Sequence, residues 1–159
     1  MAVAGLGLGE ALITGKSWLL AGGVLSGIAA LLHFACIVGG PRWYRFFGAG
    51  ERMVRLAERG SFRPAMITIA IALMLGIWSS YALSGAGLIP RLPLLRTALV
   101  MICAIYLLRA AALPLMLARM PDRGTTFLVV SSFVVLVFGL VYLLGIVMAW
   151  SQLGAMFQP

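Results

Sequence analysis

Four long apolar stretches fill most of this 159-residue chain and constrain its fold more than any other feature. They cover about residues 18–39, 65–83, 97–117 and 126–150. Each is close to the ~20 helical residues that cross the ~30 Å hydrocarbon core of a bilayer. Apolar residues make up 63% of the chain, against roughly half in a soluble domain. The sequence therefore predicts a protein whose solvent is lipid.

The apolar stretches predict helices rather than strands. They are continuous runs of Leu, Ile, Val and Ala without the period-2 alternation of a membrane barrel. An isolated strand would also leave backbone polar groups unpaired in lipid. We expect an all-α integral membrane protein, with residues 1–159 forming a single domain built as a compact four-helix bundle.

Positive charge is concentrated between the first two stretches and predicts the orientation. Residues 40–64 carry six arginines and residues 118–125 carry two, against Lys16, Arg91 and Arg96 on the opposite side. Basic loops stay in the cytoplasm. Both termini are therefore expected outside the cytoplasm, and the two helical hairpins are expected to run the same way. We expect the bacterial inner membrane as the location.

The first cytoplasmic loop is the segment that differs most from a spanning helix. An aromatic run follows Pro41, and residues 51–59 predict a short helix in which Glu51 and Arg55 are spaced i,i+4. Rings and guanidinium groups suit the headgroup region. One interpretation is an interfacial anchor, and the other is a recognition surface for a partner or an anionic substrate. The residues concerned are Trp43, Arg42, Arg45, Arg52, Arg55 and Arg59.

The net charge of +8 fits the same interpretation. In a membrane protein, loops rich in arginine favour anionic lipid headgroups as partners. We therefore expect membrane lipid, and not nucleic acid, to meet these charges.

Few residues can carry chemistry. The chain has four carboxylates, all outside the predicted spans, and one histidine. Proton relays and cation carriers place Asp or Glu inside the membrane, and general acid–base pairs need such groups as well. Cys36 and Cys103 are isolated and form no CxxC pair. We therefore expect no catalytic residues, no metal site and no cofactor.

Arg109 is the exception inside a span. A charged arginine near a helix centre costs about 2.5–3.5 kcal/mol, so it needs a partner, water or the interface. His33, Thr68, Ser131 and Ser132 are expected at a similar depth on the other three helices. One hypothesis is a small cytoplasm-facing anion or lipid-headgroup site made of these five residues. The alternative is that Arg109 extends to the headgroups while His33 bonds a neighbouring helix.

Helix packing has its own signals. Gly23 and Gly27 form a GxxxG pair, which predicts the close approach of another backbone, from this chain or from a second copy. Pro114 lies late in the third stretch and should kink it. Trp78, Ser79, Ser80, Tyr81 and Trp150 are expected as an interfacial belt on the outer side.

These observations favour a small membrane protein of accessory or interaction type without catalysis of its own. A homo-oligomer or a partner membrane protein is a reasonable expectation, because one protomer has little interior. The alternative is a small oligomeric transporter or channel for an anionic or amphipathic solute. A third possibility is an integral membrane enzyme acting on a lipid-like substrate near His33 and Arg109.

Overall fold

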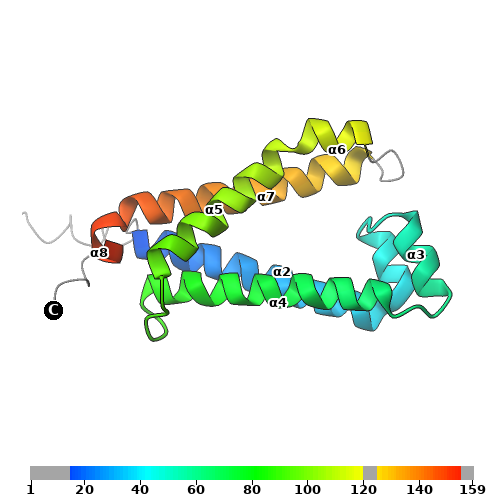
Figure 1. Cartoon of the computed structure of the whole chain (residues 1–159), viewed down its shortest axis with the longest axis horizontal. Coiled ribbons are helices and arrows are strands. Elements are labelled where there is room, and N and C mark those ends of the chain that lie inside the picture. The colour runs from blue at the N-terminus through cyan, green and yellow to red at the C-terminus, as the bar shows by residue number, and fades with distance from the viewer. Residues whose placement is uncertain (1–14, 120–124, 155–159) are drawn as a thin grey trace, which may run out of the picture.

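The computed structural model describes residues 15–119 and 125–154, and all regular secondary structure in them is helical (Figure 1). The helices are α2 (Gly15–Phe46), α3 (Glu51–Glu58), α4 (Arg63–Ala86), α5 (Leu95–Ala111), α6 (Leu113–Arg119), α7 (Thr125–Met148) and α8 (Trp150–Gly154).

Three helices, α2, α4 and α7, are long and apolar enough to cross a membrane. The pair α5 and α6 makes a fourth span if its two parts are counted together. The predicted spans fall on these helices, with 97–117 divided between α5 and α6. The protein is thus membrane-embedded and, in its described residues, all-helical, as the sequence predicts.

The third span is bent by 50° between α5 and α6. The break lies at Ala112, two residues before Pro114. A proline lacks the backbone N–H of a helical residue, and its ring clashes with the carbonyl four positions earlier, here that of Ala110. The kink predicted at this proline is therefore confirmed.

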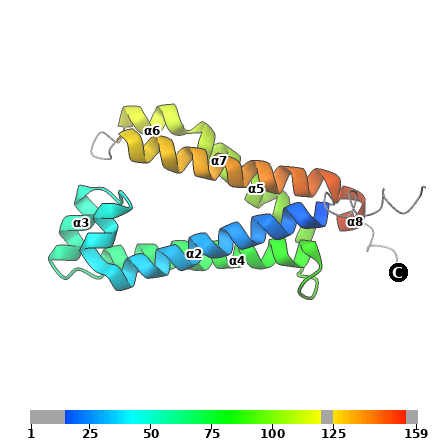
Figure 2. The same cartoon turned by 180° about the vertical axis from the view of Figure 1, so that it is seen from behind.

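The helices form two arms (Figures 1 and 2). Helix α4 lies along α2 in one arm, and α7 lies along α5 in the other. The arms meet near α8 and diverge toward α3 and α6. We call the end near α8, where the arms meet, the closed end. We call the end near α3 and α6, which carries residues 41–63, the basic end. The predicted compact bundle is therefore not what the structure has, because the four helices pack together over only part of their length.

The main core lies at the closed end, where both arms contribute. It includes Leu19, Leu99, Tyr106, Tyr142 and Ile146, all at most 4% exposed. Glycines bring the helices together there. A Cβ on Gly145 would lie 2.9 Å from a Leu19 side-chain carbon, and one on Gly22 would lie 2.8 Å from the Tyr142 ring. Because α7 meets α2 through glycine, the two arms touch with almost no space between them.

The predicted GxxxG face packs within the same chain. A Cβ on Gly23 would lie 3.0 Å from Leu83, and one on Gly27 would lie 3.2 Å from the Ser79 hydroxyl, both on α4. The sequence did not determine which backbone packs against this face. In the structure it is that of α4.

At the basic end, α2 changes direction at Gly40, which has φ 62° and ψ −149° and precedes Pro41. Glycine populates positive φ readily, which makes this break inexpensive. After Phe46 the chain turns into α3, confirming the predicted short helix. Val54 of α3 is 1% exposed and packs in a small cluster with Cys36 and Tyr44. The loop thus folds back on α2 around a small core of its own.

Candidate binding surface at the basic end

The structure separates the five residues of the predicted anion site. Arg109 donates from Nη1 to the Ser132 hydroxyl at 3.2 Å, so these two residues are brought together between α5 and α7. Ser131, beside Ser132, donates to the Leu128 carbonyl in its own helix. Arg109 also lies in the last turn of α5, where a positive charge complements the helix dipole.

His33 and Thr68 lie on the other arm and bond to their own helices. The His33 Nδ1 is 2.7 Å from the Ala29 carbonyl oxygen. A carbonyl only accepts, so Nδ1 carries the proton. The Thr68 hydroxyl donates to the Pro64 carbonyl at 2.8 Å. Both side chains therefore bond to backbone carbonyls of their own helices, and these bonds do not involve Arg109.

The arginines at the basic end are mostly not neutralised by the protein. Arg45 pairs with Glu58 at 2.7 Å, and Arg55 approaches Glu51 at 4.0 Å, both on the surface. Such exposed pairs contribute at most about 1 kcal/mol. Four further arginines are exposed and have no carboxylate partner among the described residues: Arg42, Arg52, Arg59 and Arg63. This end therefore carries a surplus of positive charge that a partner outside the chain can meet.

Large aromatic side chains are exposed beside these arginines. Phe46 and Phe62 are each 83% exposed, and Trp43 is 42% exposed. Phe47 is half-buried and lies 5.1 Å from Phe46 and 5.9 Å from Trp43 between ring centroids. Aromatic rings with an apolar body and neighbouring cations are typical of side chains at the headgroup level of a bilayer. The basic end thus combines the two residue types that an anionic membrane surface binds.

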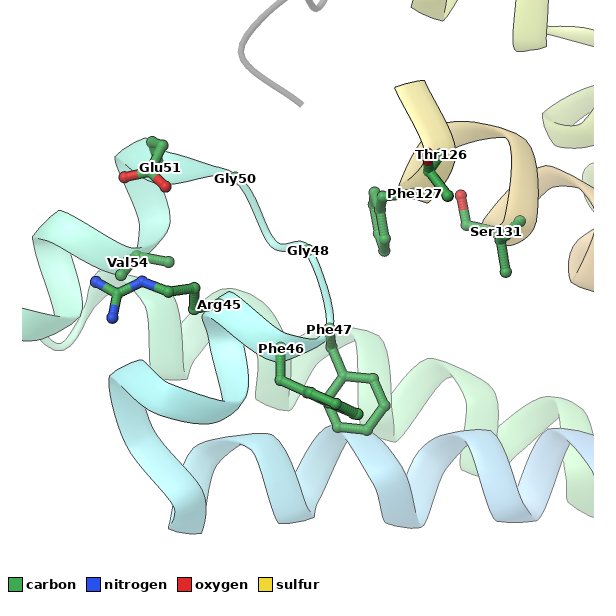
Figure 3. A pocket seen from close by; sticks show the side chains of 11 residues that line it. Arg45, Phe46, Phe47, Gly48, Gly50, Glu51, Val54, Thr126, Phe127 and Ser131 are labelled. Carbon is green, nitrogen blue, oxygen red and sulfur yellow. The ribbon is translucent and has the colours of Figure 1, made fainter. Parts of the chain in front are cut away.

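A cleft of about 600 Å³ lies between the arms at the basic end (Figure 3). One wall comes from the end of α2, the following turn and α3, and the other from the start of α7. Ser131 is the one residue of the predicted anion site that lines it. The lining residues are Arg45, Phe46, Phe47, Gly48, Gly50, Glu51, Val54, Thr126, Phe127, Val130 and Ser131.

A chain of hydroxyl groups at the closed end was not predicted. The Tyr142 hydroxyl donates to the Trp78 carbonyl at 3.2 Å. It has one proton, so in its 3.0 Å bond with Ser26 the serine donates. The Ser26 proton is then committed, so in its own 3.0 Å bond Tyr106 donates to Ser26. One directed chain, Tyr106 to Ser26 to Tyr142 to the Trp78 carbonyl, joins all four long helices.

Contacts between aromatic rings and a hydrogen bond from a second serine add to the contacts around this hydroxyl chain. Tyr106 packs edge-on against Trp78 at 4.9 Å and lies 5.5 Å from Tyr142 between centroids. Ser79 is 9% exposed and donates to the Gly23 carbonyl at 2.7 Å. Ser79 is therefore interior, not part of the predicted interfacial belt. The sequence does contain a signal for the hydroxyl chain, namely Tyr106 and Tyr142 deep within apolar spans. A phenol in lipid needs a hydrogen-bond partner.

Two arginines at the closed end bind the protein itself. Arg91 donates to the Leu153 carbonyl in α8. The Arg96 guanidinium carbon lies 3.3 Å from the centroid of the Trp150 ring, a cation–π contact. Arg91 therefore fastens α8 to the connection between α4 and α5, and Arg96 fastens it to the first turn of α5.

Within residues 15–119 and 125–154, no group of three His, Cys, Asp or Glu side chains is placed to hold a metal ion. No family model matches the chain, and neither the curated proteins nor the solved structures provide a match.

Proposed function

We propose that this chain is a small membrane protein of accessory type, without catalysis of its own, that acts by binding at its basic end. Its main ligand is the anionic headgroup surface of one leaflet. The observation that carries the proposal is the combination, at one end, of three exposed aromatic rings and four exposed arginines that have no carboxylate partner among the described residues. Each basic residue near an anionic surface contributes about 1 kcal/mol of attraction.

The proposal includes an orientation. The basic end faces the cytoplasm of a bacterium and both termini lie outside, because basic loops are retained in the cytoplasm. A reporter active only in the cytoplasm should be inactive when fused after residue 159 and active when inserted near Gly60, which is exposed and has open space around it. The reverse pattern would overturn this orientation.

Lipid selection tests the binding role. The protein is reconstituted into bilayers of equal dioleoylphosphatidylglycerol and dioleoylphosphatidylcholine, and the lipids that remain with it after mild extraction are measured. Wild type should be enriched in the anionic lipid, and the enrichment should decrease at high salt because exposed charges are screened.

The decisive variant replaces Arg52, Arg59 and Arg63 with glutamine, which should bring the lipid ratio close to that of the bulk bilayer. The matched control replaces the same residues with lysine, retains the charge and should preserve most of the enrichment. Equal ratios in wild type, the glutamine variant and the lysine variant would contradict the proposed function. Native mass spectra of the same samples give the number of protomers and show whether a partner membrane protein is bound.

Transport of an anionic or amphipathic solute is the second candidate function. One observation favours it: a cleft separates the arms at the basic end, while side chains fill the space between them at the closed end. A transporter would alternate between two such arrangements. Release of a trapped anionic fluorophore from proteoliposomes distinguishes the candidates, since a binding protein leaves it inside.

A further inference from the structure

The cleft at the basic end has walls suited to a hydrocarbon chain. Phe47 and Val54 contribute apolar surface on one side, and Phe127 and Val130 contribute it on the other. The two walls touch at one point, because a Cβ on Gly48 would clash with the Phe127 ring. Figure 3 shows the side chains of Phe127 and Ser131 on the α7 side of the cleft, facing the turn that carries Gly48.

Apolar space that opens beside a bilayer does not stay empty. Water beside the apolar part of the lining, formed by Phe47, Val54, Phe127 and Val130, loses hydrogen bonds that these side chains cannot replace. Lipid chains are the apolar molecules that a membrane-embedded protein meets at the highest concentration. The volume of about 600 Å³ is within the range of small-molecule sites, about 300–1,000 Å³. An acyl chain entering from the side therefore fits both the chemistry and the size of the cleft.

The rim adds charge at the headgroup level. Arg45 lines the cleft, and Arg42 lines an adjoining hollow that shares Phe46 and Phe47 with it. Glu51 also lines the cleft, but Arg55 approaches it, while Glu58 pairs with Arg45. Because no carboxylate in the described part of the chain pairs with Arg42 or Arg52, the positive surplus favours a phosphate without a compensating cation on the same headgroup.

From this geometry we propose that the cleft binds one anionic phospholipid, with an acyl chain between Phe127, Val130 and Phe47 and with its phosphate near Arg45 and Arg42. The proposal builds on the proposed function and adds a discrete site to it. A surface that only attracts lipid exchanges many molecules, whereas this cleft retains a single one.

The test blocks the cleft without disturbing the core. Val130 lines the cleft and is 55% exposed, so Val130→Trp fills the space while leaving buried packing unchanged. The matched control is Val129→Trp, since Val129 is the adjacent residue of α7, is 44% exposed and does not line the cleft. A smaller change, Val130→Gln, places a polar group in the path of the acyl chain.

Native mass spectrometry is performed on protein from the mixed phosphatidylglycerol and phosphatidylcholine bilayers, at increasing collision energy. Wild type and Val129→Trp should each retain one phosphatidylglycerol after the other lipids have dissociated. Val130→Trp should reduce that bound fraction at least tenfold, and Val130→Gln should reduce it less. Thermal unfolding of the four proteins shows that they are equally folded.

Equal retention by the Val129 and Val130 variants would overturn the cleft proposal, as would indifference to the headgroup. A wild-type dimer that Val130→Trp dissociates would also overturn it, in favour of a second copy as the occupant. If the cleft proposal fails while the triple arginine variant still loses anionic lipid, the proposed function stands. If that variant has no effect while Val130 controls one bound lipid, the proposed function fails and the cleft remains a lipid site.

Discussion

The closed and basic ends of this protein use the same few polar residue types for opposite purposes. At the closed end, Arg91 and Arg96 bind groups of the protein itself, and the hydroxyl groups of Ser26, Tyr106 and Tyr142 bond to one another. At the basic end, Arg42, Arg52, Arg59 and Arg63 have no carboxylate partner within the described chain, and a cleft separates the arms.

A polar group serves the structure where the fold supplies its partner, as for Arg91 and Arg96. It is available to a ligand where the described residues supply no carboxylate, as for the four arginines of the basic end. Leu19 and Tyr142 are fully buried where the arms meet, whereas Phe46 and Phe62 are 83% exposed where they diverge. Substitutions at the closed end should therefore reduce stability. Substitutions at the basic end should affect binding, unless they touch the contact between Gly48 and Phe127.

The largest stability effect is expected for Gly145→Leu at the closed end. Its side chain would meet Leu19, including the backbone nitrogen at 3.0 Å, which cannot rotate away. Overpacking of this kind costs about 3 kcal/mol of unfolding free energy, measurable by denaturant titration in mixed micelles. Gly76→Leu is the control, since nothing lies within 4 Å of its Cβ position. Equal destabilisation by both would contradict the tight meeting of the arms.

A smaller effect is expected for Gly48→Ala at the basic end, compared with Gly60→Ala. Both glycines have positive φ, 63° and 71°, so each alanine costs about 1–2 kcal/mol of backbone strain. Only at Gly48 does the added Cβ also meet a ring, that of Phe127. Gly48→Ala should therefore be about 1 kcal/mol worse. Adding Phe127→Ala should remove the difference, and a difference that persists would show that the ring contact is not its cause.

The smallest effect is expected for the hydroxyl chain. Ser26→Ala should cost about 1 kcal/mol, because hydrogen bonds between membrane helices contribute about 0.6 kcal/mol on average and up to roughly 1.7 kcal/mol, and Ser26 makes two of them. Ser80→Ala is the control, since that hydroxyl bonds to Gly76 in its own helix. In a double-mutant cycle, Ser26→Ala and Tyr106→Phe should cost less together than the sum of the single changes. Simple additivity would contradict the bond between them.

The sequence predicted the elements of the fold well, because local patterns determine them. The length of the apolar runs predicted the membrane helices, Pro114 predicted the bend, and the charged segment after Gly50 predicted α3. The divergence of the arms was not predictable, since it depends on which small residues face each other over long sequence distances. Gly145 packs against Leu19, and no local pattern in α7 identifies that partner.

The candidate site was predictable in its charge but not in its geometry. Depth along the helices put all five residues in one layer, and the structure joins Arg109 to Ser132 by a hydrogen bond. Depth could not indicate that His33 and Thr68 belong to the other arm. The aromatic and basic residues of the first loop were identified from sequence. The cleft was not, because its second wall is the start of α7, about 80 residues further along the chain.

Because the chain is made from its N-terminus, the hydrogen bonds of Ser26 can form only late in translation. Ser26 and Ser79 are made before Tyr106 and Tyr142, so the hairpin of α2 and α4 can form its bond from Ser79 to Gly23 while the second hairpin does not yet exist. Throughout that interval Ser26 lacks both tyrosine partners. The half-synthesised protein thus holds in the membrane a polar group whose partners are supplied only by the second half of translation.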